Sequence, residues 1–516
     1  MASGVVRRTG GSPRNRELLA LIPVAVLLTI GFAAVFAQDD RQLSNLSLSY
    51  GLYFLAVCLA THIYIRIRLP DADPYLFPLL ALLTAFGLVM IYRLDAELAK
   101  ELARDQANWF VIGLILFAVV VQFLRDYTVL ERYRYTIAAV GIGLLLAPRL
   151  PIIGAQVNGA YLGVKIGPFG FQPAELSKIC IIIFLASYLR EHRELLVVGA
   201  RRILGVTLPP LKHFGPLLVV WGASMFMLIF IKDLGSSLMF YAAFLSLLYV
   251  ATGRLSFVVI GMAMFLFGAW VIYQTVPHVT DRVDIWLDPY QDPGGAGYQV
   301  LQSMFAQADG GLFGKGFAQS MVLIPGGDSA LLPAAQTDMI YALIVSELGL
   351  FGGCAIIAIY LLIAARGFKI ALLANDGFSK LLATGLTAVF AIQAFVIIGG
   401  VTRVIPLTGV TLPLVSYGGS SILANFILLA LLLLVSDRAR REARTGENAE
   451  MTGEYRVGHG DAVGNEVVVD GRVAGQVPPT VLCRRDMKAV GTSVVVSEHV
   501  VGLVQQDCSG GLHPPL

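Results

Sequence analysis

The sequence of 516 residues is poor in charged side chains. Only 14% of its residues are Asp, Glu, Lys or Arg, and 56% are hydrophobic, whereas a soluble globular domain carries about a quarter charged residues. A water-soluble fold of this composition would expose large apolar patches, which excludes an ordinary soluble domain. The net charge of +3 is also small and gives no support for nucleic-acid binding.

Cysteine and histidine are scarce as well, with five and seven residues. The cysteines stand singly, without the spacing of a disulfide framework or a metal site. We interpret them as small hydrophobic residues: Cys58, Cys180, Cys354, Cys483 and Cys508. The histidines are dispersed, and we assign no catalytic role to them.

Long apolar runs fill most of the chain instead, and the mean hydropathy is +0.73. Runs of roughly 17 to 28 residues match the length that an α-helix needs to cross about 30 Å of hydrocarbon. The sequence therefore predicts an all-α fold, a polytopic transmembrane bundle of about twelve helices. The predicted spans are 17–36, 50–67, 73–94, 108–124, 134–150, 172–191, 213–231, 237–253, 256–276, 339–366, 381–401 and 420–436.

Lys and Arg are concentrated in alternate loops of this pattern. By the positive-inside rule, both termini are expected in the cytoplasm and the long segment 277–338 outside. Two shorter outward loops, 154–173 and 402–421, combine Gly and Pro turns with polar residues at a helix mouth. We expect the three outward segments to converge on one site. Residues 439–516 are polar and lack a sustained apolar period, which predicts a mostly disordered cytoplasmic tail.

The three outward segments carry ordered motifs. The first is WLDPYQDPGGAGYQ at 286–299, followed by Gln302-Ser303, by GGLFGKG at 310–316 and by QTDMI at 336–340. The second is NGA at 158–160 with QPAELSK at 172–178. The third is RVIPLTG at 403–409 with LPLVSYGGSS at 412–421.

These blocks together resemble the SEDS family (shape, elongation, division and sporulation), and within it RodA-like members of actinobacterial type. The resemblance covers 73–438, which corresponds to the family's ten-helix core. Residues 1–72 then form a cytoplasmic N-terminus and two additional helices. The sequence departs from the family at Tyr161-Leu162, where many members have Arg-Trp, and at Ile231-Lys232-Asp233-Leu234-Gly235, where many have Gln-Pro-Asp-Leu-Gly.

The resemblance implies a peptidoglycan glycosyltransferase in the bacterial cytoplasmic membrane, which polymerises lipid II at the outer face during cell wall synthesis. It also implies a class B penicillin-binding protein as the partner. Two other functions fit the same pattern, a lipid II flippase and a scaffold that only positions a partner enzyme. Charged groups in a helix bundle suit transport almost as well as catalysis.

Asp292 is the expected catalytic residue, as general base or as a ligand of a divalent cation, Mg²⁺ or Mn²⁺; no organic cofactor is expected. Cations at Lys178, Arg403 or Lys232 would stabilise the leaving pyrophosphate. The other candidate substrate-binding residues are Glu175, Asp233, Lys315, Gln299 and Asp338.

Each assignment has a purely structural alternative. Asp292 precedes a proline in a Gly-rich loop and could be an ordinary turn residue. Glu175 and Lys178 are three residues apart on one helical face and could form only a local ion pair. The remaining alternatives are a solvated helix end for Lys232-Asp233, an N-terminal helix charge for Asp338 and an interfacial anchor for Arg403.

Overall fold

The computed structural model describes residues 13–38, 45–98, 101–150, 154–157, 160–166, 169–197, 201–203, 206–208, 222, 234–324, 330–452, 462–463, 466–469 and 472–476. The predicted helix 213–231, apart from residue 222, and the candidates Lys232 and Asp233 lie outside these residues. The chain separates into two units, Met1–Arg440 and Arg441–Leu516.

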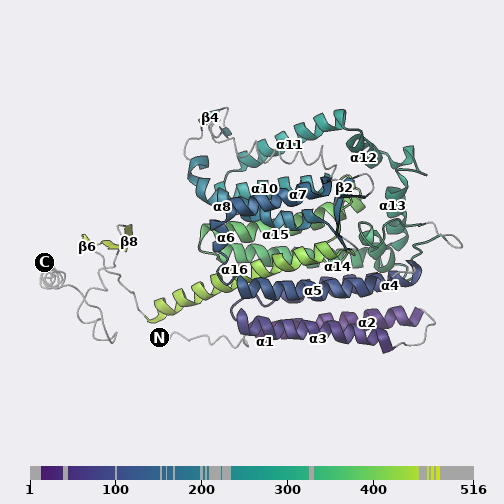
Figure 1. Ribbon diagram of the computed structural model, residues 1–516, viewed down its shortest axis with the longest axis horizontal. Coiled ribbons are helices and arrows are strands. Elements are labelled where there is room, and N and C mark those ends of the chain that lie inside the picture. The colour runs from purple at the N-terminus through teal and green to yellow at the C-terminus, as the bar shows by residue number, and fades with distance from the viewer. Residues whose placement is uncertain are drawn as a thin grey trace, which may run out of the picture. The chain divides into compact units, whose positions relative to one another are not determined.

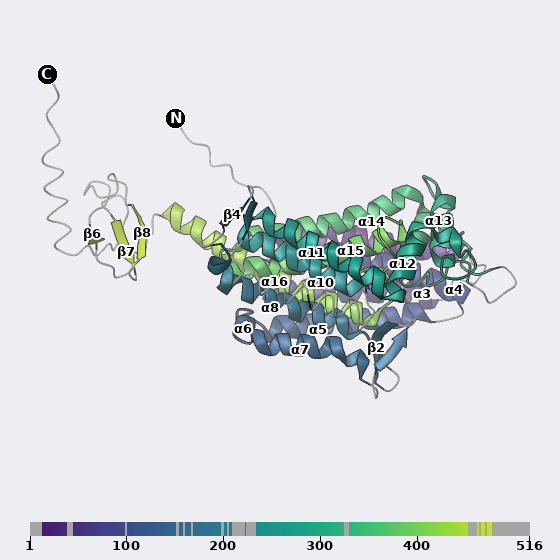
Figure 2. The ribbon, with the colours of Figure 1, turned by 90° about the horizontal axis from the view of Figure 1, so that it is seen from above.

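The first unit is a bundle of long helices, drawn in Figures 1 and 2. Nine of the described helices are long and apolar enough to cross a membrane, and the all-α prediction is confirmed. These nine and α8 (Pro173–Val197) are the long helices of the described part. The nine are α2 (Ile22–Gln38), α3 (Asn45–Arg68), α4 (Leu76–Leu98), α5 (Leu102–Phe123), α10 (Leu234–Thr252), α11 (Leu255–Thr275), α14 (Ile340–Leu373), α15 (Gly377–Val401) and α16 (Gly419–Thr452).

Shorter elements connect these helices. The helical ones are α1 (Pro13–Ala20), α6 (Val129–Arg132), α7 (Arg134–Leu146), η1 (Ala147–Arg149), α12 (Pro277–Leu287), η3 (Pro289–Gln291) and α13 (Tyr298–Gly310). The strands are β1 (Gly154–Val157), β2 (Ala160–Ile166), β3 (Phe169–Phe171), β4 (Arg201–Ile203) and β5 (Val206–Leu208). Strands β1 to β3 form an antiparallel sheet in sequence order, and β4 pairs with β5.

Helix α15 lies at the centre of the bundle, where it packs against α14, α10 and α8. Its sequence is apolar almost throughout, and most of its side chains are buried. Helix α7 packs along α8 on one side, and α4 packs against α5 and α14 on the other. The all-round hydrophobicity of α15 is typical of a helix buried inside a bundle.

The N-terminal helices are joined to the bundle by polar and aromatic contacts. The buried carboxylate of Glu17 contacts Arg14 and lies 2.9 Å from Nδ1 of His62. The Arg14 guanidinium also donates to the carbonyl of Ala72, just before α4. Nearer the other end of α3, the rings of Phe54 and Phe110 are stacked with centroids 4.3 Å apart. Helix α3 is thereby fixed against α5.

Helix α14 is interrupted at Gly349, where φ is 69° and ψ is −172°. Its backbone groups at the break bond instead to the preceding GGLFGKG segment. Lys315 and Gly316 donate to the carbonyls of Ser346 and Glu347, and the amide of Leu350 donates to the carbonyl of Gly311 at 2.9 Å. A broken helix is tolerated at membrane depth only if its freed backbone groups are paired in this way.

A buried ion pair fastens the same segment from the other side. Nε of Arg93, on α4, lies 2.6 Å from Oε1 of Glu347, and both side chains are at most 1% exposed. The other carboxylate oxygen of Glu347 accepts from the amide of Ala318 at 3.0 Å. The described part of segment 277–338 is thus more structured than its Gly and Pro content predicts, because it contains α12 (Pro277–Leu287), η3 (Pro289–Gln291) and α13 (Tyr298–Gly310) and is hydrogen-bonded to the bundle.

The second unit contains the end of α16 and a three-stranded antiparallel sheet of β6 (Ala462–Val463), β7 (Glu466–Val469) and β8 (Arg472–Gln476). The predicted tail begins at 439, but α16 continues to Thr452. The last part of α16 is rich in charged residues and lacks an apolar face, which a helix needs only where it packs against others.

Candidate active site

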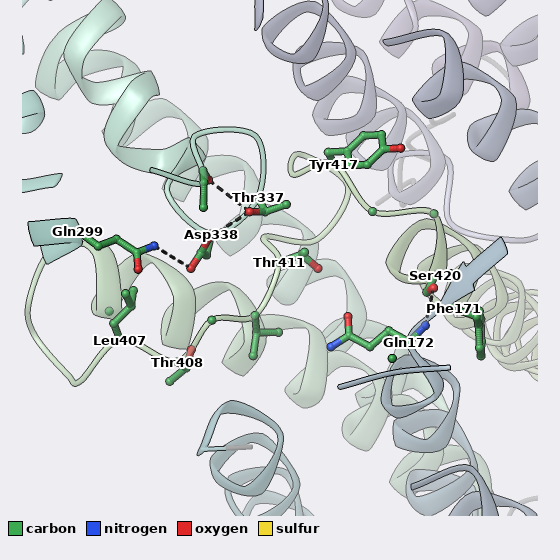
Figure 3. A pocket seen from close by; sticks show the side chains of 18 of the residues that line it. Phe171, Gln172, Gln299, Thr337, Asp338, Leu407, Thr408, Thr411, Tyr417 and Ser420 are labelled. Atoms are coloured by element: carbon green, nitrogen blue, oxygen red, sulfur yellow. Dashed lines mark hydrogen bonds between the residues drawn. The ribbon is translucent and has the colours of Figure 1, made fainter. Parts of the chain in front are cut away.

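One end of the bundle holds a cavity of about 1320 Å³. All three motif-bearing segments line it, so the predicted convergence is confirmed. They contribute residues 163–172, 281–300, 334–338 and 400–420 in part, and α5 adds Asp105, Asn108, Trp109, Val111 and Ile112. Figure 3 shows Gln299 and Asp338 at one side of this cavity, Gln172 and Ser420 at the other, and Thr411 between them.

Polar contacts hold the segments together around the cavity. The amide of Tyr417 donates to the carbonyl of Gln336 at 2.8 Å, which joins the third segment to the first. The amide of Gln172 donates to Oγ of Ser420 at 2.8 Å, which joins the second to the third. The hydroxyl of Ser303 donates to the carbonyl of Val401 at 3.1 Å.

Arg403 lines the cavity and stabilises the end of α12. Its guanidinium donates to the carbonyls of Trp286 at 2.8 Å and Leu287 at 2.5 Å, where the helix leaves carbonyls without intrahelical partners. Trp286 in turn donates from its indole nitrogen to the carbonyl of Arg403 at 3.1 Å. Arg403 therefore positions α12 and also places a cation at the cavity wall.

Gln299 and Asp338 are brought together in the cavity. The amide of Gln299 donates to Oδ2 of Asp338 at 3.2 Å, and the hydroxyl of Thr337 donates to Oδ1 at 3.0 Å. Burial raises the pKa of Asp338, while the two hydrogen bonds and the positive charge of Arg282 act in the opposite direction. Asp338 directly precedes the N-terminal turn of α14, as its structural alternative also requires.

Asp292 does not itself line the cavity, but it is hydrogen-bonded to a residue that does. Its exposed carboxylate accepts from the amide of Ala296 at 2.8 Å, and Ala296 lines the cavity. The turn is tight, because a Cβ on Gly295 would lie 2.2 Å from Oδ2 of Asp292. This is the geometry of the turn alternative. The catalytic role stays a prediction.

Glu175 and Lys178 are buried in the first two turns of α8, which begins directly after the lining residue Gln172. The ammonium of Lys178 is 2.5 Å from Oε2 of Glu175, and both side chains are 3% exposed. It also donates to Oε1 of Gln393 at 2.5 Å. The local ion pair is therefore present, and a direct contact of this pair with substrate stays a prediction.

Lys315 is placed away from the other candidates. The side chain of Lys315 is exposed, and its Nζ lies 2.7 Å from Oδ2 of Asp309. Its backbone, rather than its ammonium, connects it to α14. Substrate binding by Lys315 stays a prediction.

The described residues contain no group of three or more His, Cys, Asp or Glu side chains that could hold a metal ion. A protein-only metal site is therefore not formed by these residues. Mg²⁺ in phosphate-handling sites is usually held by one or two carboxylates together with substrate oxygens. Asp292 fits the protein's part of that arrangement.

The sequence interpretation missed several residues of the site. Arg282, on α12, lines the cavity and donates to the carbonyl of Leu407 at 2.7 Å. Lys165 lines it from β2, three residues after the Tyr161-Leu162 pair, where many family members have Arg-Trp. Gln393 offered the clearest signal, because it is a lone amide within the apolar run 381–401.

The comparisons with known proteins agree with these blocks. The model of the FtsW/RodA/SpoVE family, described as "Cell cycle protein", matches residues 74–441. The chain belongs to this family. SEDS is another name for the group that the motifs resemble, so the sequence resemblance is confirmed. Helices α1 to α3 lie outside the match.

Curated relatives of this SEDS chain include RodA proteins from mycobacteria. Peptidoglycan glycosyltransferase RodA of Mycobacterium tuberculosis (strain ATCC 25618 / H37Rv) is 44% identical over 439 residues, which are 84% of this chain and 92% of the relative. Stage V sporulation protein E of Bacillus subtilis (strain 168) is 32% identical over 366 residues, 70% of this chain and 95% of the relative. The similarity to mycobacterial RodA agrees with the predicted RodA-like, actinobacterial type.

Two solved structures resemble the fold. A chain in the structure described as "Structural coordination of polymerization and crosslinking by a peptidoglycan synthase complex" has a TM-score of 0.56 and 27% identity, covering 72% of this chain and 98% of that chain. Rod shape determining protein RodA of Thermus thermophilus has a TM-score of 0.50 and 24% identity, with 72% and 98% covered. The second supports the fold alone.

Proposed function

We propose that this chain is a peptidoglycan glycosyltransferase that polymerises lipid II at the outer face of the cytoplasmic membrane. The observation that carries the proposal is the single cavity lined by all three SEDS blocks. Its lining combines cations, carboxylates and apolar residues, which suits a substrate with a pyrophosphate, two sugars and a lipid chain.

The reaction joins two activated disaccharides. The 4-hydroxyl of the acceptor attacks the anomeric carbon of the donor, a new glycosidic C–O bond forms, and the bond from that carbon to the pyrophosphate oxygen breaks. Undecaprenyl pyrophosphate leaves with the bonding electron pair. Because the donor is already activated, one base is sufficient. Asp292, which is hydrogen-bonded to the lining residue Ala296, would accept the hydroxyl proton.

Positive groups in the cavity suit the leaving group. Arg282, Arg403 and Lys165 line it, and fixed cations stabilise negative charge that develops in a transition state. A divalent cation held by Asp292 would supply the same stabilisation when bound. The arginines are also anchored to backbone carbonyls, so their positions are set before substrate binds.

The membrane orientation follows from charge. Arg66, Arg68 and Arg125 lie at or just beyond the C-terminal ends of α3 and α5, and Arg190, Arg366 and Arg438 lie in the C-terminal halves of α8, α14 and α16. The cavity is lined by residues of the N-terminal halves of α3, α5 and α16 and by residues just before α8 and α14. The positive-inside rule then places those arginines in the cytoplasm and the cavity outside. Both termini are cytoplasmic in this orientation, as the sequence predicts.

A class B penicillin-binding protein is the proposed partner. The structure of a peptidoglycan synthase complex that resembles this chain is described as coordinating polymerization and crosslinking. A transpeptidase would crosslink the glycan strands that this chain makes.

Asp292→Asn tests the enzyme against the flippase and the scaffold. The amide keeps the size of the carboxylate but removes the base, so glycan formation from labelled lipid II should fall by about 10²- to 10⁴-fold. Purified wild type and variant are compared with and without the partner, together with lipid II binding and movement across vesicles. Near wild-type polymerisation by the variant would exclude Asp292 as the base. A wild type that moves lipid II but never polymerises it would favour the flippase.

A further inference from the structure

Gln393 connects the buried ion pair on α8 to the wall of the cavity. Its Oε1 accepts from Lys178 at 2.5 Å, and its Nε2 donates to Oε1 of Glu175 at 3.3 Å. The same Nε2 donates to the carbonyl of Thr411 at 3.1 Å, and Thr411 lines the cavity. Both ends of the amide are therefore engaged.

The position is costly for an amide. Gln393 is 0% exposed and lies in a helix whose neighbouring side chains are apolar. A buried amide without hydrogen bonds destabilises the folded protein, whereas an aliphatic side chain at such a position does not. The three contacts offset this cost only while the ion pair and Thr411 keep their places.

The segment that Gln393 holds forms one wall of the cavity. We name residues 407–411 the strap; every one of them lines the cavity. Arg282 holds one end of the strap through the carbonyl of Leu407 at 2.7 Å, and Gln393 holds the other end. Between them Gly409 has φ of 70°, a conformation that favours glycine. These two side chains anchor the strap at its ends, and the side chain of Val410 packs into the core between them.

We propose that Gln393 is a positioning residue through which the Glu175–Lys178 pair sets the position of the strap. The pair is buried at α8 and reaches the described cavity wall by the amide of Gln393. It therefore influences the bound substrate through the strap rather than by touching it. The identity of that substrate, lipid II, rests on the proposed function.

Gln393→Leu tests the connection by removing both ends of the amide. Trp109 and Trp286 line the cavity, so intrinsic fluorescence reports lipid II binding to the purified protein. Loss of one strap anchor should weaken lipid II affinity roughly fivefold, the factor that corresponds to a net hydrogen bond of about 1 kcal/mol. An equal change of the exposed glutamine of α11, Gln274→Leu, should leave the affinity unchanged.

Gln393→Glu supplies a readout that loss of packing would not produce. A protonated carboxyl group accepts from Lys178 and donates to the Thr411 carbonyl as the amide does, but an ionised one cannot donate. Glu175 and Lys178 are the charged groups that contact this position among the described residues. Lipid II affinity of this variant should therefore fall as pH rises, relative to wild type and to Gln274→Glu.

The outcomes separate the two proposals. Wild-type affinity in Gln393→Leu, or a Gln393→Glu affinity that follows wild type at every pH, overturns the positioning role. If Gln393→Leu fails to fold, the pH profile of Gln393→Glu decides. If wild-type protein binds lipid II but forms no glycan, the proposed function fails, and the binding measurements still decide the role of Gln393.

Discussion

Lys178→Met should destabilise the protein strongly, because it leaves the carboxylate of Glu175 buried without its cation. Both partners are 3% exposed and 2.5 Å apart, so solvent screens the pair little. Removing one partner of a buried ion pair typically costs about 3–5 kcal/mol, while replacing both with neutral residues of similar volume is often close to neutral. The double change Glu175→Gln with Lys178→Met should therefore be milder than Lys178→Met alone.

The assay is unfolding of the purified protein in mixed micelles by increasing SDS, followed by the loss of helical circular dichroism. The four proteins of the cycle are wild type, both single variants and the double variant, and the coupling energy should be about 3 kcal/mol or more in magnitude. Arg104→Met is a matched control, because Arg104 is 63% exposed and pairs with Glu101, which is 78% exposed. A stable Lys178→Met, or a double variant as unstable as the sum of the singles, would refute the reasoning.

Three further results are expected. In a protein without native cysteines, Tyr290→Cys should react with an impermeant reagent outside cells and Lys369→Cys should not; the opposite labelling would invert the topology. Gly349→Ala should lower the free energy of unfolding by about 1–3 kcal/mol or more through backbone strain, since a Cβ there would lie 2.3 Å from the carbonyl oxygen of Leu312. An unchanged melting temperature would contradict this. Because burial raises the pKa of Asp338, the folded protein takes up this proton at higher pH than the unfolded chain, so its contribution to stability is complete below about pH 3.9 and is lost as pH rises through the folded value. Asp338→Asn should flatten that slope, and an identical pH dependence of stability in the variant would count against it.

The sequence predicted the helix bundle and several residues of the cavity, but it did not predict which residues these would contact. Apolar runs place helices directly, because lipid demands one continuous hydrophobic length for each crossing. Gln299, Asp338 and Arg403 could be predicted for the cavity, because each lies in a polar motif at a helix mouth. The same kind of motif contains Lys178, but its burial against Gln393, which is 215 residues away in the sequence, could not be predicted. No local pattern encodes such a partner.

Arg282 shows a different limit of the sequence. Its neighbours PHVTDRV at 277–283 follow an apolar helix and precede the motif that contains Asp292, so the segment looks like a connection. The structure makes it part of α12, whose C-terminal carbonyls Arg403 holds. Arg282 therefore lies on a helix whose end is stabilised by a residue of a different segment, Arg403.

The N-terminal helices contribute to the cavity although they lie outside the family core. The family match begins at residue 74, and the sequence treats 1–72 as an addition. Yet Tyr53, on α3, lines the cavity. Its neighbour Phe54 is stacked on Phe110 of α5, and the contact of Glu17 with His62 holds the opposite end of the same helix. A helix fixed at both ends presents Tyr53 at a defined place, so the added helices belong to the wall of the site as well as to its support.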